Sequence, residues 1–193
     1  WHRKCLKLKT KRIRCKVKNF YDVYNHNIAE TIEDLPTIYC DMDMVLCDFL
    51  KRAEEVLGKP FPKADPITRW PMISGTKDFW ASLEWMPGSK KMWQFISKYN
   101  PHILSAYSTK DANSRKGKTD WLRKNAKLTQ KSRIHLVMRE DKQKYAMTRD
   151  GKPNLLIDDY IKNINEFKAK GGIGVHHTSA MGTIAELKRL GFK

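Results

Sequence analysis

The chain has 193 residues, 40% of them hydrophobic, and a formal net charge of +17. That length suits one domain, or a compact domain with a small insertion, and the apolar fraction is sufficient for a buried core. No apolar run reaches the roughly 18 residues of a membrane span, and the basic N-terminus lacks the apolar stretch of a secretory signal. The four cysteines show no zinc-binding spacing with histidine, so we expect a reduced, cytoplasmic setting.

Residues 1–36 form a basic extension. Residues 1–19 hold nine Lys or Arg and no acid, and apolar residues alternate with basic ones on both sides of Thr10-Lys11-Arg12. This alternation predicts a β-hairpin, with residues 21–34 as a short helix or loop after it. Such a ribbon would bind the phosphates of nucleotides or nucleic acid, or it would only keep an edge hairpin soluble, because edge lysines also prevent aggregation.

The next region begins with a predicted strand, Thr37-Ile38-Tyr39-Cys40, which stops at the carboxylates of Asp41 and Asp43. A predicted helix follows over residues 49–57. From residue 59 to 99 the composition changes, with five prolines and four tryptophans. We interpret residues 50–99 as a small, mainly helical cap inserted into the core. Its tryptophans either pack inside the cap or stack on a base of the substrate.

Strands and helices alternate over the last part of the chain. Expected helices cover residues 116–125 and 183–190. Expected strands cover residues 101–105, 133–138, 154–157 and 173–176. Such alternation predicts an α/β fold, a parallel sheet with helices on both faces. In these sheets, ligands bind beyond the carboxyl ends of the strands.

Polar side chains gather at the carboxyl ends of the predicted strands. Asp41 and Asp43 follow the first strand, Ser105 ends the second, and Asp158-Asp159 end a later one. Adjacent buried carboxylates are costly without a counter-ion. Mg²⁺ prefers hard oxygen ligands and binds through one or two carboxylates together with a substrate phosphate. We therefore expect a Mg²⁺ site between carboxylates of two separate strands.

The motifs at these strand ends resemble those of the haloacid dehalogenase (HAD) superfamily of phosphatases. The segment Asp41-Met42-Asp43-Met44-Val45-Leu46-Cys47-Asp48-Phe49 is similar to the first HAD motif, and most similar to its form in the 5'(3')-deoxyribonucleotidase and 5'-nucleotidase branch. Leu104-Ser105 resembles the second motif, and the segment from Leu155 to Asp159 resembles the fourth. That branch usually has glycine where this chain has Met44.

The resemblance extends over residues 37–193 and implies a Rossmann-like HAD core at 37–49 and 100–193. It implies that Asp41 is a nucleophile that forms an aspartyl-phosphate and that Asp43 is the general acid and base. Phosphate would be held by Ser105, Ala106 and a lysine. The implied Mg²⁺ ligands are Asp41, the backbone carbonyl of Asp43, and Asp158. Asp159 would either bind the metal directly or support a residue that binds it.

Three lysines are candidates for the lysine of the third motif. Lys142 has the spacing to Tyr145-Ala146 that is most similar to family members, and Lys144 is the main alternative. Lys118, on the helix expected before that strand, is a third choice.

The resulting hypothesis is a Mg²⁺-dependent phosphomonoesterase that acts on nucleoside 5'-monophosphates. Two alternatives remain open. The chain would be a polynucleotide end phosphatase if residues 1–19 hold the strand. It would be a non-catalytic HAD scaffold if the basic N-terminus only binds nucleic acid or a partner. No membrane partner is expected, and the pattern does not determine the oligomeric state.

Overall fold

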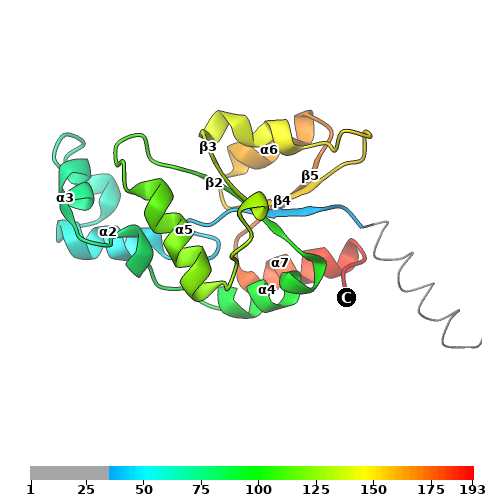
Figure 1. Ribbon diagram of the computed structural model, residues 1–193, viewed down its shortest axis with the longest axis horizontal. Coiled ribbons are helices and arrows are strands. Elements are labelled where there is room, and N and C mark those ends of the chain that lie inside the picture. The colour runs from blue at the N-terminus through cyan, green and yellow to red at the C-terminus, as the bar shows by residue number, and fades with distance from the viewer. Residues whose placement is uncertain (1–34) are drawn as a thin grey trace, which may run out of the picture. The chain divides into compact units, whose positions relative to one another are not determined.

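A parallel β-sheet lies at the centre of the computed structural model, which describes residues 35–193 (Figure 1). The sheet has five strands in the order β3-β2-β1-β4-β5, and every paired neighbour is parallel. The strands are β1 (Ile38–Cys40), β2 (His102–Ala106), β3 (Ile134–Val137), β4 (Leu155–Asp158) and β5 (Ile173–His176). Because β1 pairs with both β2 and β4, the residues that follow these three strands emerge side by side.

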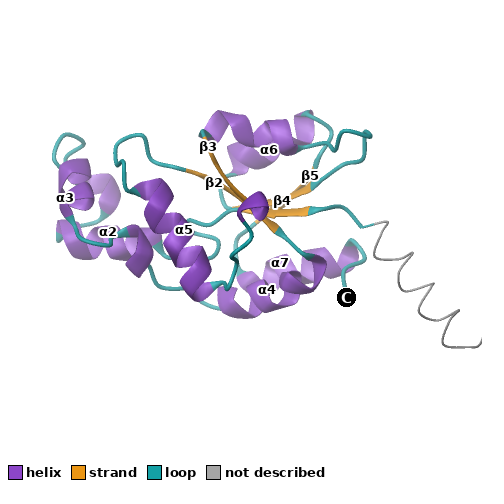
Figure 2. Cartoon of the chain, in the orientation of Figure 1, coloured by secondary structure: helices purple, strands orange, loops and turns teal. Residues whose placement is uncertain are grey.

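Helices cover both faces of the sheet (Figure 2). They are α2 (Phe49–Leu57), α3 (Arg69–Gly75), α4 (Ser89–Ile96), α5 (Ser114–Asn125), α6 (Ile161–Ala169) and α7 (Ala180–Arg189). The 3₁₀-helices are η1 (Phe61–Lys63), η2 (Trp80–Ser82), η3 (Ser97–Tyr99), η4 (Lys131–Arg133) and η5 (Arg139–Tyr145). The predicted α/β class with a doubly covered parallel sheet is therefore confirmed.

Alternation along the strands divides the core between the two faces. Ile38 and Cys40 of β1 point into the larger cluster, which α4, α5 and α7 complete, whereas Tyr39 packs with the smaller cluster beneath α6 and η5. In β4, Leu155 and Ile157 likewise belong to the larger cluster. Side chains of a strand alternate between faces, so strands buried on both sides read as continuous apolar runs.

Some predicted element bounds differ from those of the structure by one to three residues. The last helix begins at Ala180 rather than at residue 183, because the Ser179 side chain caps it and accepts a hydrogen bond of 3.2 Å from the Gly182 amide. The helix expected from residue 116 begins at Ser114. Asp48 caps α2 in the same way as Ser179 caps α7, accepting from the Lys51 amide at 2.9 Å.

The segment interpreted as a cap contains helices with different neighbours. α2 packs against α3, whereas α4 packs against α7 beside the sheet. Trp80 and Trp93 are buried, and the Phe49 ring stacks on Trp80 with centroids 5.5 Å apart, so these two tryptophans pack in the core rather than present an open stacking surface. The cap boundaries at residues 50 and 99 stay a prediction.

Two further sequence expectations concern the chain outside the sheet. The hairpin and the helix or loop predicted for the N-terminal extension fall on residues 1–34, which lie outside the described residues. Among residues 35–193, no helix has the length and apolar character needed to cross a membrane.

Candidate active site

Three carboxylates from two neighbouring strands converge at the carboxyl edge of the sheet. Asp41 follows β1 directly, Asp158 is the last residue of β4, and Asp159 comes after it. One oxygen from each of the three lies within 4.8 Å of the others. Asp41 and Asp158 are both buried, so their charges meet in a region with little access to water. The structure thus brings together the carboxylates that the sequence placed on separate strands.

Lys142 lies between two of these carboxylates. Its Nζ is 2.8 Å from Asp41 Oδ2 and 2.7 Å from Asp158 Oδ2, and its side chain is buried. Burial by itself would lower the pKa of Lys142, but the charges of Asp41 and Asp158 outweigh it and raise that pKa. Lys144, the alternative, is exposed and pairs with Asp141 instead. Of the two, only Lys142 contacts the carboxylate cluster.

Lys118 is a second buried lysine, next to the loop that follows β1. Its Nζ donates to Asp43 Oδ2 at 2.7 Å, to Ser105 Oγ at 3.1 Å and to the Ala106 carbonyl at 2.5 Å. An ammonium group has three donors, and all three are used. The sequence offered Lys118 and Lys142 as alternatives for one role, but the structure places both at the strand ends, on different carboxylates.

The environment of Asp41 favours its ionised form. Burial would raise the pKa of Asp41, but the charges of Lys142 and Lys118 and the hydrogen bonds from Lys142 and Ser105 lower it below its ordinary value. The Met42 amide also donates to Asp41 Oδ1 at 2.7 Å. A carboxylate that stays ionised and is held by several donors is suited to act as a nucleophile.

Asp43 has the opposite tendency. Burial raises its pKa, the charge of Lys118 lowers it in part, and the nearby Asp41 charge raises it further, so that the pKa lies above its usual value. The Cys47 thiol is 3.7 Å from Asp43 Oδ1 and donates weakly to it. Two carboxyl groups whose environments shift their pKa values in opposite directions are typical of a site that needs one base and one acid.

Asp158 is held from several sides. Its Oδ1 accepts from the Tyr160 amide at 2.9 Å, and the Asn163 side-chain amide donates to both carboxylate oxygens at 3.0 Å. The contribution of Asn163 was not predicted from the sequence. The available signal was its position beside Ile164 and Phe167 on the buried face of α6, where a polar residue requires a hydrogen-bond partner.

The carboxylate cluster carries more negative charge than Lys142 balances. Burial and the charge of Asp41 raise the pKa of Asp158 to about 6. Burial and the charges of Asp41 and Asp158 raise the pKa of Asp159 to about 7. Three hard oxygen donors that repel one another match the ligand set of Mg²⁺, because a divalent cation would remove this repulsion. The residues present therefore fit the metal that the sequence implied.

The phosphate-binding candidates lie beside this cluster. Ser105 is buried near the end of β2, and its hydroxyl accepts from Lys118, while Ala106 ends the strand. The loop after β1 turns sharply at Met44, which has a φ of 59° in the left-handed region. Glycine adopts that conformation without steric cost, which explains physically why the related motif usually has glycine at this position.

Comparison with known proteins gives a likeness of fold. No family model matches the sequence, and no curated protein sequence matches it. The fold resembles those of solved structures, among them a hydrolase from Streptococcus pneumoniae TIGR4, with a TM-score of 0.53 and 10% identity over 80% of this chain and 98% of that one.

Two further matches have lower scores. A hydrolase from Pseudomonas syringae gives a TM-score of 0.43 and 17% identity, covering 81% of this chain and 90% of its own. A HAD family hydrolase from Deinococcus radiodurans R1, with bound phosphate and sodium, gives 0.42 and 13%, covering 81% and 88%. At 10% identity, the likeness to the structure from Streptococcus pneumoniae concerns the fold alone, and it agrees with the Rossmann-like α/β arrangement expected from the sequence.

Proposed function

We propose that this chain is a HAD-type phosphomonoester hydrolase that requires Mg²⁺ and uses Asp41 as its nucleophile. The observation that carries the proposal is the meeting of Asp41, Asp158 and Asp159 at one edge of the sheet, with Lys142 bonded to the first two. The motif resemblance and the likeness of fold support the same assignment.

The first step is attack by the Asp41 carboxylate on the substrate phosphorus. An oxygen–phosphorus bond forms, the bond from phosphorus to the leaving alcohol oxygen breaks, and Asp43 supplies the proton that this oxygen takes. In the second step Asp43 takes a proton from water, the water oxygen bonds to phosphorus, and the bond to Asp41 breaks. Phosphate leaves and Asp41 is a carboxylate again. The raised pKa of Asp43 suits a group that carries a proton in the first step.

The remaining residues bind and orient the phosphoryl group. Lys142 stabilises negative charge that develops on its oxygens, and Ser105 with the backbone at Ala106 holds them in place. Asp41, Asp158, Asp159 and the backbone carbonyl of Asp43 would hold Mg²⁺, which supplies charge neutralisation between the anionic nucleophile and the anionic phosphate. Asn163 keeps Asp158 oriented toward the cluster.

The leading substrate is a nucleoside 5'-monophosphate, because the segment from Asp41 to Phe49 is most similar to the nucleotidase branch. A second candidate, the phosphorylated end of a polynucleotide, is favoured by the nine Lys or Arg among residues 1–19. The two differ in their salt dependence, because contacts with several phosphates weaken steeply as salt rises.

The test is a phosphate-release screen with Mg²⁺ over nucleotides, sugar phosphates and phosphorylated oligonucleotides. We expect turnover of nucleotides that falls by about 10³-fold or more in Asp41→Asn and is lost with a chelator. Asp150→Asn, an exposed aspartate, is the matched control and should keep full activity. A folded wild type that releases no phosphate from any substrate would exclude the enzyme and leave the scaffold hypothesis.

The substrate candidates are separated in the same screen. Deletion of residues 1–19 should leave turnover of free nucleotides nearly unchanged. If it instead abolishes turnover of oligonucleotides, and these are the better substrates at low salt, the polynucleotide assignment replaces the nucleotide one.

A further inference from the structure

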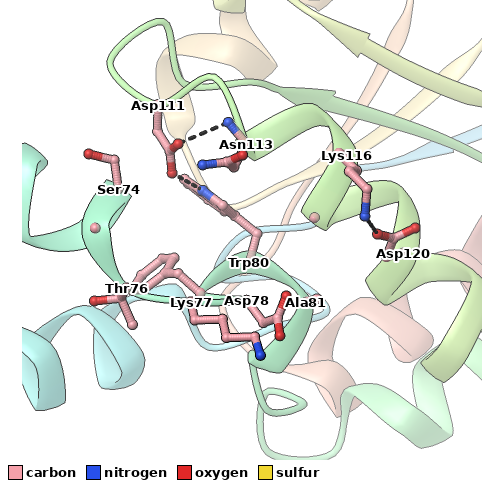
Figure 3. Close-up of a pocket in the computed structure, with 13 residues that line it drawn as sticks. Ser74, Thr76, Lys77, Asp78, Trp80, Ala81, Asp111, Asn113, Lys116 and Asp120 are labelled. Atoms are coloured by element: carbon pink, nitrogen blue, oxygen red, sulfur yellow. Dashed lines mark hydrogen bonds and ion pairs between the residues drawn. The ribbon is translucent and has the colours of Figure 1, made fainter.

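Trp80 joins the segment interpreted as a cap to the loop that follows β2. Its indole Nε1 donates to Asp111 Oδ2 at 2.6 Å, and both side chains are buried (Figure 3). The second oxygen of Asp111 accepts from the Asn113 amide at 2.9 Å. Among residues 35–193 no cation forms an ion pair with Asp111, so two neutral donors hold a buried carboxylate. Each oxygen of the buried Asp111 carboxylate thus has one donor, and the Trp80 side chain is tied to the turn before α5.

The other side of Trp80 faces the candidate active site. Lys118 Nζ lies 5.1 Å from the centroid of the Trp80 ring, a distance at which the ring attracts a cation. The three donors of that ammonium are taken by Asp43, Ser105 and Ala106, and the aromatic ring closes a further side. Lys118 is fully buried, so these contacts together define where its charge lies.

The contact between Trp80 and α5 is unusually close. A Cβ added at Gly117 would lie 2.5 Å from Trp80 Cβ, which is too close for two non-bonded carbon atoms, so one of them would have to move. Glycine at position 117 therefore lets α5 approach Trp80 and brings the neighbouring Lys118 against its ring. A cavity of about 280 Å³, lined in part by Thr76, Lys77 and Lys116, lies beside this contact (Figure 3).

We infer that Trp80, held by Asp111, is a positioning residue that places Lys118 on Asp43 and Ser105. This inference rests on the proposed function. The path runs from the Asp111 carboxylate to the indole N–H, from the ring to the ammonium of Lys118, and from that ammonium to the carboxylate that protonates the leaving group. The position of the segment around Trp80 thus determines whether Asp43 is correctly placed for its proton transfer.

The test compares two substrates that differ in their need for a proton. An alkyl phosphomonoester releases a basic alkoxide that needs protonation by Asp43, whereas 4-nitrophenyl phosphate releases a phenolate that needs little. In Trp80→Phe, which keeps a ring but loses the indole N–H, kcat for the alkyl substrate should fall about 10-fold more than kcat for the aryl substrate. KM should change less than kcat for both substrates. Asp111→Leu, which removes the acceptor of the indole N–H, should shift the ratio in the same direction.

Trp93→Phe is the matched control. Trp93 is also buried, and its Nε1 donates to the Ala126 carbonyl at 3.0 Å, away from the candidate site. This variant should lose stability without changing the ratio of the two substrates. In a Lys118→Met background, Trp80→Phe should not change the ratio of the two substrates any further, because the ammonium through which Trp80 acts is already absent. Circular dichroism establishes that each variant is folded.

The outcomes separate the inference from the function on which it rests. If the wild type hydrolyses neither substrate, the proposed function fails. If the wild type hydrolyses both, and the folded Trp80→Phe and Asp111→Leu variants keep the wild-type ratio, the positioning role is overturned. Should Trp80→Phe fail to fold, Asp111→Leu decides by itself, because leucine has a similar size and offers no acceptor to the indole N–H.

Discussion

The two buried lysines of the candidate site have different surroundings. Lys142 contacts Asp41 and Asp158, with Asp159 close by, so one positive charge faces three carboxyl groups. Lys118 contacts one carboxylate, Asp43, together with a hydroxyl and a carbonyl. The first region has an excess of negative charge, whereas the second is balanced. A cation is therefore expected beside Lys142, and proton transfer beside Lys118.

The largest expected effect tests the first region. Lys142→Met leaves two buried carboxylates without their cation, so the free energy of unfolding in a chelator should fall by about 3–5 kcal/mol. Mg²⁺ should restore part of that loss, because the metal replaces the missing charge. Urea denaturation with and without Mg²⁺ measures both. Lys144→Met, at an exposed position, should change stability by less than about 0.5 kcal/mol. If Lys142→Met and the wild type were equally stable in the chelator, the proposed excess of negative charge around Lys142 would be contradicted.

A smaller effect is expected in the second region. Lys118→Met leaves Asp43 as the one unpaired carboxylate, and its side chain is 29% exposed, so water compensates in part. The free energy of unfolding should fall by about 1–3 kcal/mol, and Mg²⁺ should restore little of it. The same denaturation experiment applies. The comparison between the lysines fails if Mg²⁺ rescues this variant as well as it rescues Lys142→Met.

The smallest effect is a pH dependence of the stabilisation by Mg²⁺. The pKa values of Asp158 and Asp159 are raised to about 6 and about 7, so the stability they contribute is present below their ordinary pKa and is lost as the pH rises through these values. Mg²⁺ binds the ionised carboxylates, and the rise in Tm that it causes should therefore grow between about pH 5 and pH 8.

His102 adds a second pH dependence to the stability measured with and without metal. Burial and the nearby His135 and Arg133 lower the pKa of His102 to about 4, so its contribution to stability is lost as the pH falls from its ordinary value toward 4. This trend is opposite in sign to that of the carboxylates, but it is the same with and without metal and cancels in the difference. Asp159→Asn should flatten the pH dependence of that difference. An unchanged slope in this variant would assign the titration to another group.

The sequence predicted the residues at the strand ends well, for a physical reason. A parallel sheet aligns the carboxyl ends of its strands, so Asp41, Ser105 and Asp158 had to meet once the strands were recognised. Contacts between distant segments could not be predicted in this way. The bond between Trp80 and Asp111 joins residues 31 positions apart and leaves no periodic signal in the sequence.

The assignment of the lysines illustrates the same limit. The spacing of the third motif favoured Lys142, and the structure places Lys142 between the carboxylates. From the sequence, Lys118 was only an alternative candidate for the same lysine. Only the approach of α5 to the loop after β1 gives Lys118 a separate partner in Asp43. Asn163 was missed because its bond to Asp158 depends on how closely the start of α6 approaches the end of β4.

Two buried thiols beside the candidate site can be used to measure how often this part of the fold opens. Cys40 and Cys47 are buried and unpaired, and burial raises the pKa of both well above its ordinary value. The thiolate is the form that alkylating reagents attack, so both groups should remain unmodified while the strand end is closed. Once Cys5 and Cys15 are replaced by serine, the rate of alkylation would report how often the loop that carries Asp43 separates from the core.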